Sequence, residues 1–301
     1  MGAITPFSYV AYGLNISSEF ECPELYPRES TADVTFRLGD VPESLGSPAS
    51  PFDSSVCEAR PGKCLVRIAG VAQYLISNGN EIRVQPEPGV EFAAVRLFLL
   101  STPIGALLHQ REILPLHGSS VEMPTGAVAF LGPSGYGKST LAGALYRRGY
   151  PVLSDDICAI QHHASSATLL AGIPSIMLWR DSAEAAGYSE DDLRPVRNGL
   201  EKFRIRTDVG FAQKLTPLRS IYILETHNSP KVTINPVRGR RKFELIAPHT
   251  FRRSLVACCG SPTINFLQIT RLAALSRVAV LHRPRGPVRI EELTDAVIAD
   301  N

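Results

Sequence analysis

The sequence predicts an α/β protein with a β-rich N-terminal part, and three observations support this fold class. Residues 1–90 contain short runs in which apolar and polar residues alternate, which is typical of half-buried strands. From residue 91 onward, short apolar runs alternate with stretches of helical spacing. A glycine-rich segment at residues 132–139 joins one such strand to one such helix. We therefore expect a β-rich domain at residues 1–90 and a second domain at residues 91–301.

The N-terminal strands are separated by turn residues such as Ser77-Asn-Gly-Asn80, so we expect antiparallel hairpins. The stretch 42–55 is rich in Ser and Pro and predicts a mobile loop. The expected strands are Phe7–Tyr12, Val34–Leu38, Lys63–Ile68, Ala72–Ile76 and Glu81–Gln85.

The second domain is expected to begin with a helix, Glu91–Gln110, that Pro103 kinks or splits. A hairpin follows, with strands at 113–122 and 126–131. Ser261-Pro262 is a typical helix start, and the helix it opens should reach about Ser276. Further strands are expected at Pro151–Leu153, Ser220–Leu224, Lys231–Pro236 and Val278–Leu281.

The glycine-rich segment reads Gly132-Pro-Ser-Gly-Tyr-Gly137-Lys138-Ser139, which matches the phosphate-binding loop G-x-x-x-x-G-K-[ST]. An apolar strand, Ala127–Leu131, precedes it, and a helix is expected at Ser139–Arg148. This order directs backbone N–H groups and the positive end of the helix dipole toward one point. The chain is therefore expected to bind a nucleoside triphosphate.

Within this loop, Lys138 is expected to reach the outer phosphates and the Ser139 hydroxyl to bind Mg²⁺. The phosphate loop alone does not distinguish ATP from another donor, because it contacts phosphates and not the base. The expected nucleotide-binding residues are Pro133, Ser134, Gly135, Tyr136, Gly137, Lys138, Ser139 and Thr140.

Two adjacent carboxylates, Asp155 and Asp156, follow the strand after this helix. Their position at the carboxyl end of a strand places them beside the phosphate loop, where many proteins of this kind hold Mg²⁺. We assign the base that accepts the substrate proton to Asp155 and the metal ligand, with Ser139, to Asp156. The reverse assignment, with Asp156 as base and Asp155 as metal ligand, stays open.

Three basic side chains are further candidates for the site. His117 precedes the strand that leads to the loop and is expected near its mouth. Lys202 and Arg204 alternate with apolar residues and should share one face of a strand, where they can neutralise charge on a transferred phosphoryl group. Other runs of Arg and Lys, such as Arg238–Lys242, are expected to be solvated surface.

Composition excludes several classes of function. A net charge of +2 does not favour nucleic acid or membrane partners, and no apolar run of membrane-spanning length is evident. The six cysteines form no C-x-x-C pair, so we expect free thiols in a reducing cytoplasm. Cys22, Cys57 and Cys64 all lie in the N-terminal part, where they can approach one another.

Together these motifs resemble the HPr kinase/phosphorylase superfamily. The similar residues are His117-Gly118, Gly132–Ser139 and the segment Arg148-Gly-Tyr-Pro-Val-Leu-Ser-Asp155-Asp156, in the family's order. The resemblance implies a compact phosphate-loop catalytic core related to phosphoenolpyruvate carboxykinase. It also implies that ATP and Mg²⁺ are used, that a Ser hydroxyl is the acceptor, and that homo-oligomers are possible because the resembling kinases often assemble.

Two departures point away from HPr itself. The true HPr kinases have Glu where this chain has Thr140, and their acidic Mg²⁺ ligand has no counterpart in Leu169–Trp179. Phe7–Leu25 and Gly172–Asp181 are instead similar to HPr-kinase-like proteins of peptide biosynthesis. These include lasso-peptide kinases, which phosphorylate the C-terminal Ser of a precursor peptide.

The leading hypothesis is therefore an ATP-dependent kinase acting on a peptide Ser, with Lys138, Asp155, His117, Lys202 and Arg204 in the transfer step. A second hypothesis changes the acceptor to an HPr-like protein or a small-molecule alcohol. A third is a non-catalytic nucleotide-binding regulator, which the acid-free segment near Leu169 favours and the complete loop disfavours.

Overall fold

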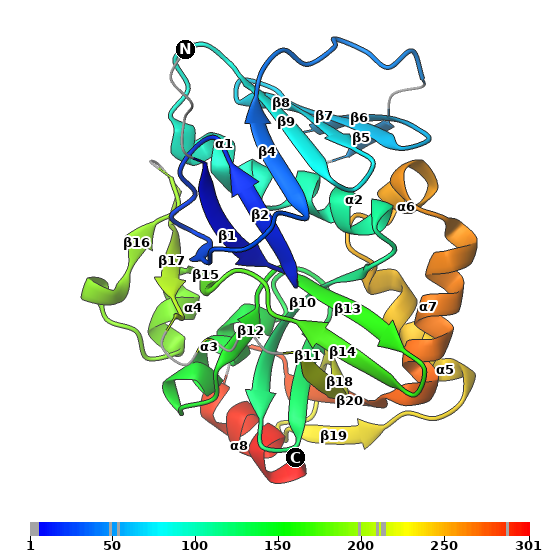
Figure 1. Cartoon of the computed structure of the whole chain (residues 1–301). Helices are drawn as coiled ribbons and strands as arrows, with labels where there is room; N and C mark the ends of the chain where they lie inside the picture. The colour runs from blue at the N-terminus through cyan, green and yellow to red at the C-terminus, as the bar shows by residue number, and fades with distance from the viewer. Residues whose placement is uncertain are drawn as a thin grey trace. The chain divides into compact units, whose positions relative to one another are not determined.

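The protein has a mixed α/β fold with large sheets, and its computed structural model describes residues 6–47, 50–52, 55–197, 200–208, 211, 215–286 and 289–301. The chain divides into two compact units, each described by itself (Figure 1). Unit 1 comprises Met1–Pro115 with Phe251–Phe266, and unit 2 comprises Leu116–Thr250 with Leu267–Asn301. Unit 1 extends past the expected boundary at residue 90 because two apolar helices and a segment from late in the chain pack with its sheet.

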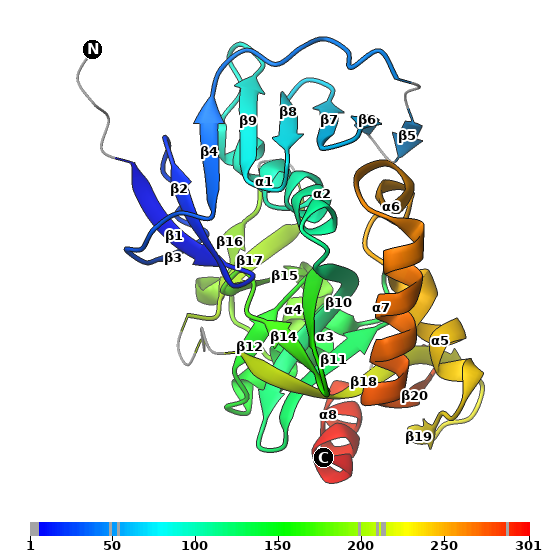
Figure 2. The same cartoon turned by 45° about the vertical axis from the view of Figure 1, so that its right-hand side comes forward.

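Unit 1 is built on a nine-stranded sheet in the order β3-β1-β2-β4-β9-β8-β7-β6-β5, and Figure 2 shows its second half as a row of strands. The pairs β2–β4 and β4–β9 are parallel and the others antiparallel. The strands are β1 (Phe7–Ala11), β2 (Leu14–Ser18), β3 (Tyr26–Pro27), β4 (Val34–Leu38), β5 (Ser50–Phe52), β6 (Ser55–Arg60), β7 (Lys63–Ile68), β8 (Ala72–Ser77) and β9 (Glu81–Pro86).

All five strands expected in this region are confirmed. The loop expected at 42–55 is wrong in part, because Ser50–Phe52 pairs with the start of β6 as an edge strand. Its Ser and Pro content is compatible with an edge position, where a missing N–H costs no ladder bond. Residues 48, 49, 53 and 54, on which part of that expectation falls, lie outside the described residues.

The expected helix at 91–110 is split, as predicted, into α1 (Phe92–Leu99) and α2 (Thr102–Gln110). Pro103 occupies the first turn of α2, where its missing N–H needs no partner. The segment Phe92–Gln110 is long and apolar enough to span a membrane, although the sequence analysis found no such run. An 18-residue window of that segment is 61% buried inside the protein, as is usual for helices of a protein core.

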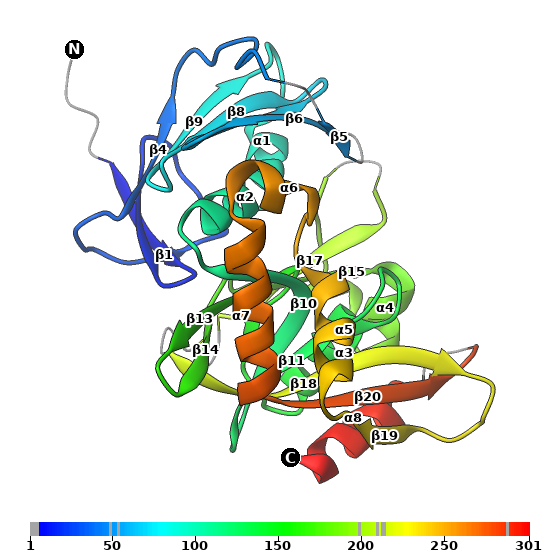
Figure 3. The same ribbon diagram turned by 90° about the vertical axis from the view of Figure 1, so that its right-hand side faces the viewer.

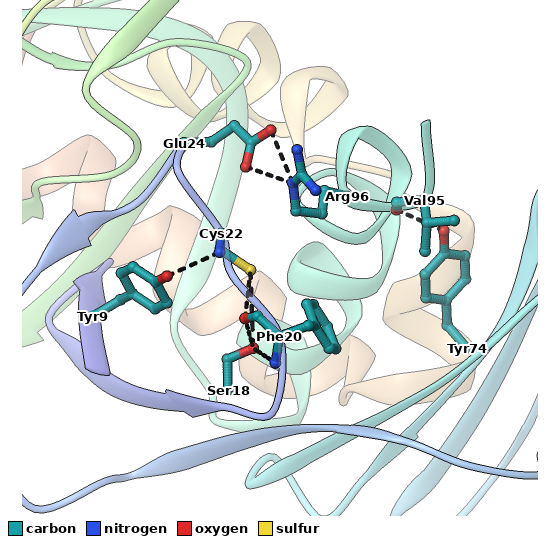
Figure 4. A network of polar contacts seen from close by, with 8 residues as sticks. All are labelled: Tyr9, Ser18, Phe20, Cys22, Glu24, Tyr74, Val95 and Arg96. Atoms are coloured by element: carbon teal, nitrogen blue, oxygen red, sulfur yellow. Dashed lines mark hydrogen bonds and ion pairs between the residues drawn. The ribbon is translucent and has the colours of Figure 1, made fainter. Parts of the chain in front are cut away.

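A polar network fixes α1 within unit 1 (Figure 4). The Arg96 guanidinium donates through Nε to both carboxylate oxygens of Glu24, at 3.2 and 3.0 Å. The fully buried Tyr74 of β8 donates its hydroxyl to the Val95 carbonyl at 2.8 Å. These bonds satisfy polar groups that would otherwise be buried without partners, so they make the docking of α1 specific.

Unit 2 contains an eight-stranded sheet in the order β11-β10-β13-β14-β18-β20-β19, with β12 paired to β10. β18 pairs with β14 at its start and in parallel with β11 over Leu218–Ile223. β18, β20 and β19 lie side by side in Figure 3. The strands are β10 (Leu114–Met123), β11 (Gly126–Leu131), β12 (Val152–Ser154), β13 (Ile157–His163), β14 (Ser166–Leu170), β18 (Thr216–His227), β19 (Thr233–Pro236) and β20 (Arg277–Pro284).

A second, three-stranded sheet in unit 2 has the order β15-β17-β16, with β15 (Ser175–Trp179), β16 (Arg194–Pro195) and β17 (Lys202–Arg206). The helices are α3 (Lys138–Arg147), α4 (Arg180–Ala185), α5 (Arg240–Ile246), α6 (Ser254–Cys259), α7 (Pro262–Leu275) and α8 (Ile290–Asp300). The unit boundary falls within α7, and α6 belongs to unit 1. Side chains of α3, α8, β11, β15, β17, β18 and β20 share one apolar core.

The predicted hairpin at 113–131, the helix after the loop, and the helix opened by Ser261-Pro262 are all confirmed. Ser261 accepts the Ile264 N–H at 3.3 Å, which is the expected N-cap bond. The expected strands Ser220–Leu224 and Val278–Leu281 are present but longer, because pairing with neighbours extends them beyond their apolar centres. The strand expected at Pro151–Leu153 is shifted by one residue, and the one expected at Lys231–Pro236 begins only at Thr233.

We predict that Tyr74→Phe lowers the free energy of unfolding by about 1 kcal/mol, because it leaves the buried Val95 carbonyl without its donor. Tyr74→Leu should cost more, since it removes the ring as well. Urea unfolding of both variants against the wild type measures the difference. Equal stability of Tyr74→Phe and wild type would show that the hydroxyl bond contributes nothing.

Candidate functional site

The candidate site begins where β11 passes into α3 through the glycine-rich loop. Gly135 and Gly137 have φ of +80° and +90°, in the left-handed region that favours glycine. A Cβ on Gly132 (φ +153°) would lie 3.0 Å from the Leu224 carbonyl oxygen of β18. These residues therefore allow the sharp turn that starts α3, whose free N–H groups and positive dipole end form an anion site.

Lys138, the first residue of α3, is buried to 7% exposure and donates to the carbonyls of Gly132 at 2.9 Å and Pro133 at 3.0 Å. An ammonium has three donors, so one remains beyond these two bonds. Burial lowers the pKa of Lys138, and the charges of Asp155 and Asp156 oppose that shift. The lysine thus places positive charge beside the loop and two carboxylates.

Asp155 is the most heavily bonded acid of the site. Its Oδ1 accepts the hydroxyls of Ser139 at 2.8 Å and Ser119 at 2.6 Å. Its Oδ2 accepts the Met177 N–H of β15 at 2.9 Å. Asp155 follows β12, which runs antiparallel to β10 as β11 does, so the carboxyl ends of β11 and β12 meet at one edge. That arrangement brings the carboxylate to the phosphate loop.

Asp156 is placed differently from its neighbour. Its backbone is left-handed (φ 71°), and its side chain is 29% exposed. His117 Nδ1 lies 3.2 Å from Asp156 Oδ1 and 3.2 Å from the Asp156 carbonyl oxygen. The two carboxylates therefore have separate surroundings: Asp155 is buried among hydroxyls at Ser139, and Asp156 is half-exposed beside an imidazole.

Gly118 allows β10 to lie close enough to hold this geometry. A Cβ there would come within 2.6 Å of both the Phe130 carbonyl oxygen and Leu131 Cδ2 of β11. No side chain fits in that space, so only glycine separates His117 from Ser119 without moving the strands apart. The His-Gly pair is thus a packing requirement as well as a part of the site.

Lys202 and Arg204 share one face of β17, as predicted, while the intervening Phe203 and Ile205 are buried in the core. Arg204 pairs in register with Met177, whose N–H contacts Asp155. Directly paired residues of an antiparallel sheet have side chains on the same face. The half-exposed face of this sheet therefore presents Met177, Trp179, Arg194, Lys202, Arg204 and Arg206 together.

The other residues expected to bind nucleotide differ in how far they are exposed to solvent. Pro133, Ser134 and Gly135 form the exposed tip of the loop, and Tyr136 packs against the core of unit 2. Thr140 is buried at 6% exposure within α3. In the downstream basic run, Arg240 and Arg241 pair with Glu244 and Lys242 Nζ donates to the Ser276 carbonyl, which fits the expected surface role.

His249 is a further candidate residue near Lys138 and His117 that the sequence did not indicate. It ends a 3₁₀ helix, Ala247–His249, and the next residue, Thr250, bridges to Leu116 of β10. Burial, followed by the charges of Lys138 and His117, lowers the pKa of His249 to about 4. No motif or spacing marks this histidine, because the contact joins strands that are distant in sequence.

No family model matches the chain, and no curated protein is similar to it. Among solved structures, it is similar to the Hpr(Ser) kinase/phosphatase from Coxiella burnetii, with 13% identity and a TM-score of 0.34. That match covers 62% of this chain and 88% of the other. A match at this level assigns neither activity nor substrate.

We predict that His249 makes folding less favourable in acid. Its pKa of about 4 in the folded protein is below its ordinary value of 6.5, so the unfolded chain binds the proton first. Its neutral form therefore stabilises the protein above pH 6.5, and this contribution falls as pH drops toward 4. His249→Gln should flatten the slope of unfolding free energy over that window in urea titrations. A slope equal to that of the wild type would contradict the prediction.

Proposed function

We propose that the chain is an ATP- and Mg²⁺-dependent kinase that transfers a phosphoryl group to a Ser hydroxyl of a peptide. The observation that carries this proposal is the contact of the phosphate loop with a carboxylate, Ser139 Oγ to Asp155 Oδ1 at 2.8 Å. A phosphate loop whose serine meets an acid at a strand end is a common arrangement for holding a metal–nucleotide complex.

The donor set fits Mg²⁺. Neighbouring ligands on an octahedral Mg²⁺ are about 3.0 Å apart, given bonds of about 2.1 Å. The oxygens of Ser139 and Asp155 already have nearly that spacing. We therefore propose Ser139 and Asp155 as the protein ligands of Mg²⁺. This exchanges the roles that the sequence analysis gave to Asp155 and Asp156. Bound Mg²⁺ would neutralise charge on the phosphate oxygens.

Asp156 is then the proposed base. Its carboxylate is half-exposed, as a group that meets an incoming substrate must be, and His117 lies within hydrogen-bond distance of it. The acceptor oxygen bonds to the γ-phosphorus, the bond from that phosphorus to the β–γ bridging oxygen breaks, and the acceptor proton passes to Asp156. His117 orients the carboxylate during this transfer.

Positive charge for the transferred group would come from Lys138 and from the basic face of β17. Lys202 and Arg204 lie on that face, and its strand is hydrogen-bonded to β15, which contacts Asp155. A C-terminal Ser has its carboxylate on the carbon next to the one that bears the hydroxyl. Cations on that face would suit the carboxylate of such an acceptor, and the exposed Trp179 (51%) offers an apolar contact for a peptide chain.

The resemblance of Phe7–Leu25 and Gly172–Asp181 to peptide-modifying kinases also supports a peptide acceptor. Incubating the chain with ATP, Mg²⁺ and peptides that end in Ser, or in Ser amide, should give phosphate on the terminal residue by mass spectrometry. Phosphorylation of an HPr-like protein or a small alcohol instead would keep the kinase and change the acceptor. ATP that binds but never transfers to any acceptor would indicate a nucleotide-binding regulator.

We predict that Lys138→Ala lowers phosphoryl transfer by roughly 10²–10³-fold, because it removes a preorganised cation from the site. A radiolabelled ATP assay measures the loss, and circular dichroism checks that the variant folds. Lys242→Ala, whose ammonium is bound to the Ser276 carbonyl at the end of α7, is the matched control and should keep its activity. Full transfer by Lys138→Ala would refute the mechanism.

We also predict that the two acids fail in different ways. Asp155→Asn should weaken Mg²⁺-dependent nucleotide binding, because it removes a charged metal ligand. Asp156→Asn should leave that binding intact and lower kcat by roughly 10²–10⁴-fold, because it removes the base. Calorimetry of nucleotide binding with and without Mg²⁺, combined with kinetics, separates the two effects. If Asp156→Asn weakened nucleotide binding and Asp155→Asn lowered only kcat, Asp155 would be the base and Asp156 the metal ligand.

A further inference from the structure

The sulfur atoms of three cysteines lie close together in unit 1. None of the three belongs to the glycine-rich loop at residues 132–139. Cys57 lies on β6, Cys64 on β7 and Cys259 at the end of α6. Their sulfur atoms all lie within 4.8 Å of one another. Two strands and a helix from distant parts of the sequence thus bring three thiols to one point.

The distances fit a shared ion. Thiolates on a tetrahedral metal with bonds of about 2.3 Å are about 3.8 Å apart. Cys57 Sγ and Cys64 Sγ are separated by 3.3 Å, and the whole set lies within 4.8 Å. Shifts of about half an ångström, well within side-chain adjustment, would bring all three sulfurs to the bond length that an ion requires.

None of the three cysteines forms a disulfide, because such a bond needs an S–S length of about 2.05 Å and Cys57 and Cys64 are 3.3 Å apart. Cys57 and Cys64 are diagonal neighbours on adjacent strands, since Cys64 pairs with Ala59 and Cys57 with Val66. Three sulfurs packed this closely without a bond between them are compatible with ligands of one shared ion.

Burial also suits a bound ion. Cys57 and Cys64 are 1% and 0% exposed, while Cys259 is only partly buried. Two inner ligands shield the ion from water, and the outer one leaves a route for entry. Thiolate ligands select soft cations over Mg²⁺ and Ca²⁺, which prefer oxygen.

We propose that Cys57, Cys64 and Cys259 form a binding site for a thiophilic d¹⁰ cation, Zn²⁺ or Cu⁺. Three thiolates suffice for trigonal Cu⁺, whereas Zn²⁺ would add a water as its fourth ligand. The ion would cross-link α6 to the β6–β7 hairpin within unit 1. This site is independent of the proposed kinase activity, because it shares no residue with the phosphate loop.

The full chain, purified under anaerobic reducing conditions, is titrated separately with Zn²⁺, buffered Cu⁺ and Co²⁺ as a spectroscopic probe. We expect one Zn²⁺ or Cu⁺ per chain after desalting, thiolate-to-metal charge-transfer absorption with Co²⁺, and a raised melting temperature. The ion retained more tightly in competition with a chelator distinguishes Zn²⁺ from Cu⁺. Failure of the wild-type chain to bind either ion stoichiometrically would overturn the proposal.

Cys259→Ser, the partly exposed position, should lose the charge-transfer band and stoichiometric binding while keeping the fold by circular dichroism. Cys22→Ser is the matched control, because Cys22 is a buried cysteine of the same unit that lies outside the cluster and contacts Ser18 and Phe20. Asp155→Asn controls for binding at the phosphate loop and should keep the band. Equal binding by wild type and Cys259→Ser, or loss in Cys22→Ser, would contradict the assignment.

Discussion

One buried carboxylate organises the candidate active site. Asp155 accepts hydroxyls from Ser119 of β10 and Ser139 of α3, and an N–H from Met177 of β15. Each of these donors comes from a different element, and Asp155 itself follows β12. Hydrogen bonds to a charged group are worth more than neutral ones, and a buried carboxylate without donors is costly. The four elements are therefore held in one arrangement by a single side chain.

The backbone turn directly after Asp155 explains why the two adjacent acids differ. Successive residues of a strand direct their side chains to opposite faces, and at Asp156 the backbone also leaves the extended conformation, with a left-handed φ of 71°. That conformation is strained for a residue other than glycine and is often found at functional sites. It moves the second carboxylate toward His117 and solvent while the first remains among donors. One short turn thus provides a buried acid and an accessible one.

Local signals predicted much of this arrangement, and tertiary contacts set the rest. The glycine-rich turn between β11 and α3, the hairpin before it and the alternation in Lys202–Arg206 are all encoded in consecutive residues, and the structure has these elements. The different surroundings of Asp155 and Asp156 depend on the φ angle of Asp156 and on the N–H of Met177, which belongs to another sheet. His249 reaches the site through a bridge from Thr250 to Leu116, and Cys259 reaches Cys57 and Cys64 through the packing of α6. The spacing of apolar residues along the sequence does not predict contacts between segments that are far apart in the chain.

Close backbone packing beneath the loop fixes the residues to which the proposed transfer is assigned. Gly118 lies against Phe130 and Leu131, and Gly132 lies against Leu224, so β10, β11 and β18 approach one another without intervening side chains at these points. Well-packed interiors deform little, and stabilisation of developing charge depends on groups that are fixed before the reaction. Lys138 is hydrogen-bonded to two carbonyls of the loop, and Ser139 is hydrogen-bonded to Asp155. Both residues are therefore anchored to these closely packed strands. Because these glycines have no side chain, the strands can pack closely and hold the charged groups of the candidate site in fixed positions.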